Sequence, residues 1–206
     1  MRNNARAILL IAAACGFVAG PWNERSAFAA ARTETAVLAG GCFWGTEGVF
    51  EHLKGVRNVV SGYAGGTRKG VGSRAGQQGD FAEAVKITYD PAVISYDRLL
   101  EIFFKVAHDP TQVNRQGPDV GRKYRSAVFP QNSQQRTAAQ KFLAQLRASR
   151  QFPKPIATKI ESGPFSLAEP DHQDYMRKHP NAPYVVINDR PKLAALKRQY
   201  PQLWRE

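Results

Sequence analysis

The chain has 206 residues, of which 43% are hydrophobic, and its formal net charge at pH 7 is +12. This length allows one domain with a hydrophobic core and is short for two. Lysine and arginine are dispersed along the chain, without a basic tract interleaved with aromatic residues, so the composition argues against a nucleic-acid-binding protein.

The first residues have the pattern of an export signal. Arg2 and Arg6 precede an apolar run over residues 7–20, and Ala27-Phe28-Ala29 has the small-x-small form of a signal-peptidase site. The apolar run is shorter than the roughly 20 residues that cross a bilayer as a helix, so a permanent membrane anchor is not expected. We predict a cleaved signal peptide over residues 1–29 and an exported, periplasmic protein.

An alternative for the same segment is a lipoprotein signal. Residues 13–16 weakly resemble a lipid-attachment site in which Cys15 would be modified. Alanines stand before Cys15 where such sites usually have a leucine, which favours the soluble interpretation. The intact mass of the mature protein distinguishes the two, because a lipidated protein would begin at Cys15.

The chain contains two cysteines, Cys15 and Cys42. Because Cys15 lies within the predicted signal, the mature protein has one cysteine and can form no internal disulfide. The histidines do not combine with the cysteines at zinc-ligand spacing, so we predict no metal and no cofactor. A single cysteine retained in an exported protein suggests a chemical role for Cys42.

Cys42 lies between a predicted strand and a predicted helix. The apolar run over residues 36–39 is the strand, two glycines follow it, and the helix covers residues 46–54. At such a helix start, unpaired backbone N–H groups and the helix dipole favour the thiolate. The alternative is a small buried hydrophobic residue, the commoner role of a lone cysteine. The adjacent Phe43 and Trp44 favour instead a thiol at the mouth of an apolar pocket.

The predicted strand over residues 81–89 places an acidic side chain among apolar ones. By the period of two, Glu83 shares a face with the apolar residues Phe81, Val85, Ile87 and Tyr89. A carboxyl group in apolar surroundings tends to hold its proton, because desolvation disfavours the anion. The alternative for Glu83 is a strand residue that faces a basic partner.

The rest of the pattern mixes strands and helices. We predict a strand over residues 56–64, a mobile loop over 67–79, a helix over 95–106, a long polar loop over 108–119, a strand over 124–129, a helix over 132–150, a strand over 156–161 and a helix over 189–200. Asp189 is expected to cap the last helix, with Pro191 in its first turn. This mixture predicts a single α+β domain over residues 30–206.

The run GCFWGTE, residues 41–47, resembles the active-site signature of the peptide methionine-S-sulfoxide reductases, the A-type methionine sulfoxide reductase family. Further runs resemble the family in the same order: SGYAGG at 61–66, AEAV at 82–85, YDP at 89–91, HDPTQVNRQGPDVGRKYRS at 108–126 and HQDY at 172–175. The resemblance covers most of residues 35–175. It implies a mixed β-sheet with helices packed around it, and a reductase domain over residues 30–206.

The resemblance also implies roles for individual residues. By similarity, Cys42 is the nucleophile, Glu83 the proton donor, Tyr63 and Tyr124 the hydrogen-bond donors to the sulfoxide oxygen, Phe43 and Trp44 the pocket for the S-methyl group, and Asp119 an organiser of the polar side of the site. The implied reaction reduces methionine-S-sulfoxide, free or in oxidised exported proteins, to methionine. It passes through a sulfenic acid on the nucleophile.

The sequence departs from the family pattern in three places. Phe81 stands where the family commonly has histidine, Lys123 where it commonly has glutamine, and the carboxy-terminal tail has no cysteine of the kind that many relatives carry. Return of Cys42 to the thiol would therefore use an outside reductant, either a small thiol or a thioredoxin-like protein. We expect a monomer, and we expect His172 to hold structure rather than to act as a base.

Two other functions fit a cysteine beside an aromatic pair. A one-cysteine peroxidase would also pass through a sulfenic acid, although the inward Glu83 suits a sulfoxide better than a peroxide. A non-enzymatic peptide-binding module would capture exposed methionine in the aromatic pocket. Turnover of hydrogen peroxide would indicate the first, and a Cys42→Ser variant that keeps its function would indicate the second.

Overall fold

A mixed sheet of six strands forms the centre of the computed structural model, which describes residues 32–66 and 80–206. The strands are β1 Glu34–Gly40, β2 Val56–Gly65, β3 Phe81–Tyr89, β6 Ser126–Phe129, β7 Lys159–Ile160 and β8 Phe165–Leu167. Their order across the sheet is β7-β6-β1-β3-β2-β8, and neighbours are antiparallel except β6 and β7. The predicted signal peptide, with its lipoprotein alternative, and the predicted loop over residues 67–79 lie outside the described residues.

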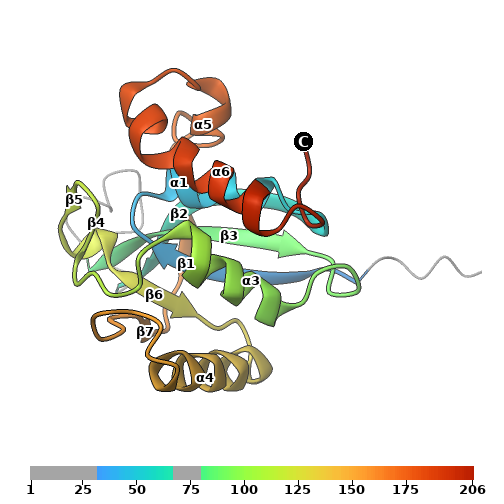
Figure 1. Cartoon of the computed structure of the whole chain (residues 1–206), viewed down its shortest axis with the longest axis vertical. Coiled ribbons are helices and arrows are strands. Elements are labelled where there is room, and N and C mark those ends of the chain that lie inside the picture. Colours follow the sequence, from blue (N-terminus) through green and yellow to red (C-terminus); the bar gives the residue numbers. More distant parts are fainter. Residues whose placement is uncertain (1–31, 67–79) are drawn as a thin grey trace, which may run out of the picture. The chain divides into compact units, whose positions relative to one another are not determined.

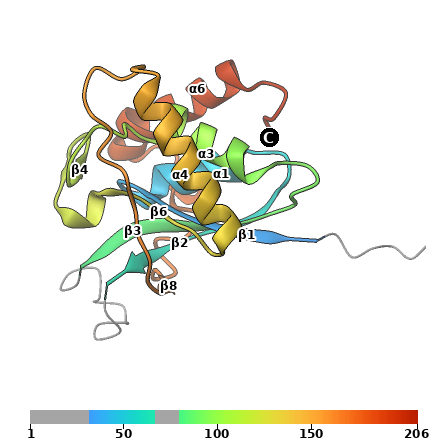
Figure 2. The same ribbon diagram turned by 90° about the horizontal axis from the view of Figure 1, so that it is seen from below.

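The helices cover one face of this sheet. They are α1 Phe43–Glu51, α3 Tyr96–Ile102, α4 Ser133–Ala148, α5 Tyr175–Lys178 and α6 Arg190–Gln199, with π-helical turns η1 Phe103–Ala107 and η3 Val185–Asp189 and the 3-10 turn η2 Arg122–Tyr124. Figure 2 shows α1, α3, α4 and α6 on the same side of the strands. The predicted α+β class, with a mixed sheet and helices packed around it, is confirmed.

Alternation along the strands separates two hydrophobic clusters. On the helix-covered face, Leu38 of β1 and Ile87 of β3 pack in one cluster with Phe50 of α1. The opposite face carries a cluster made largely of alanines, such as Ala82 and Ala84 of β3. Glu83 lies between these two alanines in sequence, so its side chain belongs to the helix-covered face, as the period of two predicts.

Two helix starts agree with the sequence. The hydroxyl of Ser95 accepts a hydrogen bond from the backbone N–H of Arg98 at the start of α3, and Asn132 accepts one from Gln135 at the start of α4. The predicted helix over residues 95–106 continues from α3 into η1, where the turns widen. These side-chain caps explain why the two helices begin where the sequence predicts.

Three predicted elements differ in the structure. The strand predicted over residues 124–129 begins at Ser126, because Tyr124 belongs to the turn η2. The N–H of Arg125 closes this turn by donating a hydrogen bond to the carbonyl of Arg122. The strand predicted over residues 156–161 is confined to β7. The polar loop over residues 108–119 contains part of a small hairpin, in which β4 Arg115–Gln116 pairs with β5 Asp119–Val120.

The expected cap at Asp189 is wrong. Its backbone is helical because η3 leads directly into α6, and its side chain makes no capping hydrogen bond. The carboxylate is fully buried and lies 3.0 Å from Nζ of Lys192 instead. Pro191 does lie in the first turn of α6, where the missing N–H is tolerated.

The carboxy-terminal part of the chain packs on α1, and Figure 1 shows α5 and α6 beside it. Gly48 of α1 lies against Met176 of α5, so closely that a Cβ at Gly48 would overlap the Met176 sulfur. Met176 is 8% exposed.

The helices within residues 32–66 and 80–206 are all too short or too polar to span a bilayer.

Candidate active site

Cys42 lies at the junction of β1 and α1. It precedes the first turn of α1, and the residue before it, Gly41, has a φ of +93°. A side chain disfavours that conformation, and a Cβ at Gly41 would also overlap the side chain of Gln116 in β4. The glycine therefore allows the turn that brings Cys42 to the start of α1. The thiol is free and the residue is 8% exposed.

The thiol form of Cys42 is favoured over the thiolate. Burial raises the pKa of Cys42 well above its ordinary value, and the negative charge of Glu83 adds to this effect. The backbone N–H of Trp44, in the first turn of α1, opposes both. Burial thus opposes the thiolate that the position at the helix start favours, because one backbone hydrogen bond does not offset the loss of water.

Glu83 reaches the start of α1 from β3. The residue is 5% exposed, its Oε2 accepts a 3.4 Å hydrogen bond from the backbone N–H of Phe43, and its Oε1 lies 3.0 Å from Nζ of Lys123. Burial raises the pKa of Glu83 by more than Lys123 and the Phe43 N–H lower it. Both interpretations of the sequence therefore hold, since the carboxyl group faces inward and also has a basic partner.

Two tyrosine hydroxyls come from the elements beside Glu83. Tyr63 of β2 is paired with Glu83 across the β2–β3 ladder, so the two side chains share a face. Burial, followed by the nearby charge of Glu169, raises the pKa of Tyr63 to about 12. Tyr124 ends η2, and burial raises its pKa as well. Both phenols keep their protons at neutral pH and can donate hydrogen bonds.

Asp119 is connected to the site through a residue that the sequence analysis missed. The hydroxyl of Tyr184 donates a hydrogen bond to Asp119 of β5. Burial raises the pKa of Tyr184, and its ring lies edge-on to the ring of Trp44 with the centres 5.6 Å apart. Tyr184 falls in a short segment without helical or strand periodicity, so no sequence pattern singled it out.

Aromatic rings surround the start of α1. Phe43 packs against Tyr63 and His172, with ring centres 5.7 and 5.3 Å apart. Trp44 stacks on Tyr175 at 3.6 Å, and its indole N–H donates a 3.2 Å hydrogen bond to Nδ1 of His172. His172 therefore holds Trp44 in place, which agrees with the structural role expected for it.

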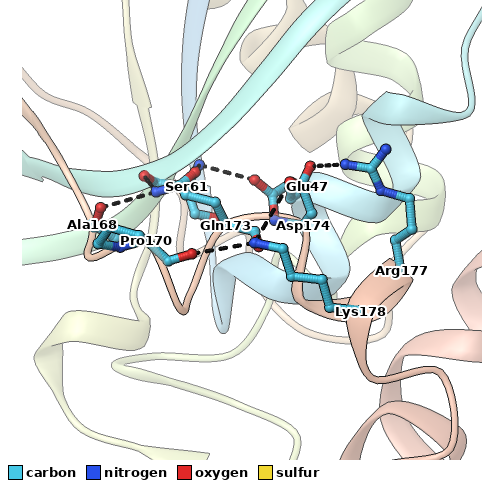
Figure 3. A network of polar contacts seen from close by, with 8 residues as sticks. All are labelled: Glu47, Ser61, Ala168, Pro170, Gln173, Asp174, Arg177 and Lys178. Carbon is cyan, nitrogen blue, oxygen red and sulfur yellow. Dashed lines mark hydrogen bonds and ion pairs between the residues drawn. The ribbon is translucent and has the colours of Figure 1, made fainter.

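A buried polar network fixes the segment that carries His172 and Tyr175 (Figure 3). Glu47 of α1 is 1% exposed and accepts hydrogen bonds from the backbone N–H groups of Ser61 and Asp174 at 3.2 and 2.9 Å. The side-chain amide of Gln173 binds the N–H and the carbonyl of Ser61 and the carbonyl of Ala168. These bonds join α1, β2 and the segment before α5, and so set the position of the aromatic rings.

A family model described as "Peptide methionine sulfoxide reductase" matches residues 34–203. The chain belongs to the peptide methionine sulfoxide reductase family. It is 49% identical over 184 residues to "Peptide methionine sulfoxide reductase MsrA 2" of Mesorhizobium japonicum, covering 86% of this chain and 93% of that protein. It is 48% identical over 171 residues to the MsrA 2 of Synechocystis, covering 82% of this chain and 80% of that protein.

Solved structures of related proteins agree with the fold. The reduced form of Mxr1 from Saccharomyces cerevisiae matches with a TM-score of 0.65 and 32% identity, covering 74% of this chain and 89% of Mxr1. Methionine sulfoxide reductase A of Corynebacterium diphtheriae matches with a TM-score of 0.61 and 31% identity, covering 73% of this chain and 76% of that protein. The resemblance stated from the motifs is confirmed, and this member of the family is an oxidoreductase.

The site of this reductase-family member assembles the sequence-predicted residues from separate elements. Cys42, Phe43 and Trp44 stand at the start of α1, Tyr63 on β2, Glu83 on β3, Asp119 on β5 and Tyr124 on η2. The additional residues are Tyr184, Lys123 and Glu169, which contact Asp119, Glu83 and Tyr63. A buried thiol, a carboxyl group and several phenols are suited to nucleophilic attack coupled to proton transfer. Within the described part of the chain, no cluster of three or more His, Cys, Asp or Glu side chains could hold a metal ion.

Proposed function

We propose that this protein reduces methionine-S-sulfoxide, free or in proteins, to methionine, with Cys42 as the nucleophile and Glu83 as the proton donor. The observation that carries the proposal is the position of the Glu83 carboxyl group, which binds the N–H of Phe43 directly after Cys42. A sulfoxide oxygen leaves poorly as an anion, so attack on the sulfur needs a proton delivered to that oxygen. Family membership supports the same reaction.

The proton balance of the reaction needs no other acid. The sulfur of Cys42 attacks the sulfoxide sulfur, and the thiol proton passes through Glu83 to the sulfoxide oxygen. The S–O bond of the substrate breaks, the oxygen and its proton end on Cys42 as a sulfenic acid, and methionine leaves reduced by two electrons. Tyr63 and Tyr124 donate hydrogen bonds to the oxygen while charge develops on it.

The aromatic residues supply the substrate pocket in this proposal. Phe43 and Trp44 form the apolar wall for the S-methyl group, and the Asp119–Tyr184 pair lies on the polar side. Trp44 is held by its contacts with Tyr175 and His172, so its face is presented in a fixed orientation. A rigid apolar wall opposite a set of oxygen-binding hydroxyls distinguishes the two sulfoxide epimers, since only one places its methyl and oxygen correctly.

The sulfenic acid would be reduced from outside. Cys42 is the free cysteine of the described residues, and the other cysteine of the chain, Cys15, lies in the predicted signal. A first external thiol would form a mixed disulfide with Cys42 and release water, and a second thiol would release Cys42 as the thiol. A small thiol or a thioredoxin-like protein fits this step. With the signal-like residues 1–29, the natural task would be repair of oxidised exported proteins by a periplasmic monomer.

A stereospecific assay tests the proposed function. The S and R epimers of a methionine sulfoxide peptide are incubated with dithiothreitol and either the wild type or Cys42→Ser. We expect the wild type to reduce the S epimer and not the R epimer, and Cys42→Ser to reduce neither. Faster turnover of hydrogen peroxide than of the S epimer would favour a peroxidase. Binding of the methionine peptide that is unchanged in Cys42→Ser would favour a binding module.

A further inference from the structure

Lys123 makes direct contact with the buried carboxyl group of the site. Its Nζ lies 3.0 Å from Oε1 of Glu83, and the side chains are 39% and 6% exposed. The same ammonium lies 4.7 Å from the ring centre of Tyr124.

The groups that face the Cys42–Glu83 pair come from every element around it. From α1 there are Cys42 itself and the N–H of Phe43, from β2 Tyr63, from β5 Asp119, and from η2 Lys123 and Tyr124. Asp189, which is paired with Lys192, also acts on Cys42. Tyr63, Tyr124 and Tyr184 are neutral near pH 7, and Asp119 and Asp189 can add only negative charge.

Lys123 is thus the cation in contact with Glu83 among the described residues. Desolvation lowers the pKa of Lys123, but its contacts with Tyr124 and Glu83 raise it by more, so the ammonium stays charged across the range in which enzymes are assayed. A positive charge at this distance favours the ionised form of each neighbouring acid. It acts directly on the carboxyl group of Glu83.

We propose that Lys123 is a positioning residue of the reductase site, whose ammonium holds the Glu83 carboxyl group beside Cys42. Through this contact, the pair carries the single proton that the reaction uses at lower pH than it would without the lysine. This inference rests on the proposed function. The reactive form has one proton shared by the thiol and the carboxyl group. Removal of the cation makes loss of the carboxyl proton harder, so the acid limit of activity moves to higher pH.

The first test is the pH profile of kcat/KM for the S-sulfoxide in wild type, Lys123→Gln and Lys123→Arg. In a reaction with separate sulfoxide and thiol steps, this ratio reports on the sulfoxide step alone. We expect Lys123→Gln to move the acid limb upward by about one pH unit or more, and Lys123→Arg to stay near the wild type. Arg122→Gln is the matched control, because Arg122 pairs with the exposed Asp80 and its side chain is 69% exposed. A lower kcat/KM with unmoved limbs would mean a structural role only and would overturn the proposal.

The second test needs no turnover. In a Cys42→Ser background with ¹³C-labelled glutamate, the carboxyl resonance of Glu83 is titrated with and without the Lys123→Gln substitution, and Glu83→Gln identifies the signal. We expect the midpoint to rise by about one pH unit or more with Lys123→Gln. An unchanged midpoint would refute the inference. If the wild type fails to reduce either sulfoxide but the midpoint moves, the proposed function fails while the control of Glu83 by Lys123 stands.

Discussion

Burial raises the pKa values of Cys42 and Glu83 for a common reason, which is the removal of both side chains from water. Each also opposes ionisation of the other, since a thiolate beside a carboxylate would leave two negative charges in a buried place. In the proposed reaction, the thiol and the carboxyl group together supply the proton that the sulfoxide oxygen receives. This behaviour is set by two residues that are distant in the chain and meet where β3 approaches the start of α1.

The role of Glu83 as proton carrier predicts the effect of Glu83→Gln. The carboxamide keeps an oxygen for the N–H of Phe43 but cannot release a proton, so we expect kcat/KM for the S-sulfoxide to fall by about 10²- to 10⁴-fold. The reductase assay with dithiothreitol measures it, and Glu206→Gln, at a side chain 82% exposed, is the control. Activity close to that of the wild type would remove Glu83 from the proton path.

Two tyrosine hydroxyls form a matched pair for testing Tyr184. The hydroxyl of Tyr184 binds Asp119, whereas the buried hydroxyl of Tyr96 has no partner within residues 32–66 and 80–206. We expect Tyr184→Phe to lower kcat/KM about tenfold or more, because a bond to a carboxylate is lost and Asp119 is freed. Tyr96→Phe should keep its activity and unfold at the same or higher urea concentration. Equal effects of the two changes would argue against a role for Tyr184 in the site.

At the scale of elements, the position of α1 depends on a buried carboxylate. Burial, with the charge of Glu51 second, raises the pKa of Glu47 from 4.5 to about 7. The folded state therefore binds a proton that the unfolded state has lost between these values. The free energy of unfolding should fall as pH rises from about 4.5 to 7, by at most about 1.4 kcal/mol per pH unit from this residue.

Urea denaturation at pH 5, 6, 7 and 8 in wild type and Glu47→Gln measures this contribution. The amide does not titrate, so we expect a shallower decline of the unfolding free energy between pH 5 and 7 in the variant. The variant should also be less stable at every pH, because one backbone N–H loses its acceptor. Parallel pH curves for the two proteins would show that Glu47 does not titrate in this range. The comparison removes the contributions of groups that do not interact with Glu47, and any difference that remains belongs to Glu47 together with its neighbour Glu51.

Local patterns in the sequence predicted the elements whose causes are local. The strand over residues 81–89 and the capped starts at Ser95 and Asn132 follow from periodicity and from side chains within a few residues. Asp189 has the composition of a helix cap, but the preceding turn η3 and the distant packing of α1 decide its conformation. Reasoning from local sequence considers such a residue alone, and so misses the tertiary contacts that determine its conformation.

The residues of the site also fall into those that local sequence predicts and those that depend on distant contacts. Cys42, Phe43 and Trp44 are adjacent in the chain, and the motif sufficed to identify them. The contacts of Lys123 with Glu83 and of Tyr184 with Asp119 join segments that are distant in the chain, 65 residues apart in the second case. They depend on how η2 packs against β3 and on the path of the segment before α6, which no local pattern encodes. The motif also could not show that burial of Cys42 outweighs the helix start.

At the scale of the whole molecule, Arg125 joins parts of the fold that are distant in sequence. Its guanidinium makes two hydrogen bonds to Glu161, at 3.0 and 2.8 Å, and one to the carbonyl of Asp80 at 3.0 Å. Arg125 is 7% exposed, so removing it leaves Glu161 without its counter-charge in a partly buried place.

We expect Arg125→Met to lower the free energy of unfolding by about 3 kcal/mol in urea denaturation. Arg98→Met, which breaks an ion pair with Glu101 at a side chain 43% exposed, should cost less than about 1 kcal/mol. A similar loss in both variants would show that the contacts of Arg125 contribute no more than a surface pair.

The contact between Met176 and Gly48 bears on the durability of the protein itself. The chain has two methionines, the initiator and Met176. Met176 is 8% exposed and its sulfur packs against Gly48, so the folded chain leaves little of the thioether open to peroxide. A catalyst of this repair reaction that kept many exposed methionines would compete with its clients for its own active site. Within the described residues, this chain keeps its one methionine sulfur in the interior.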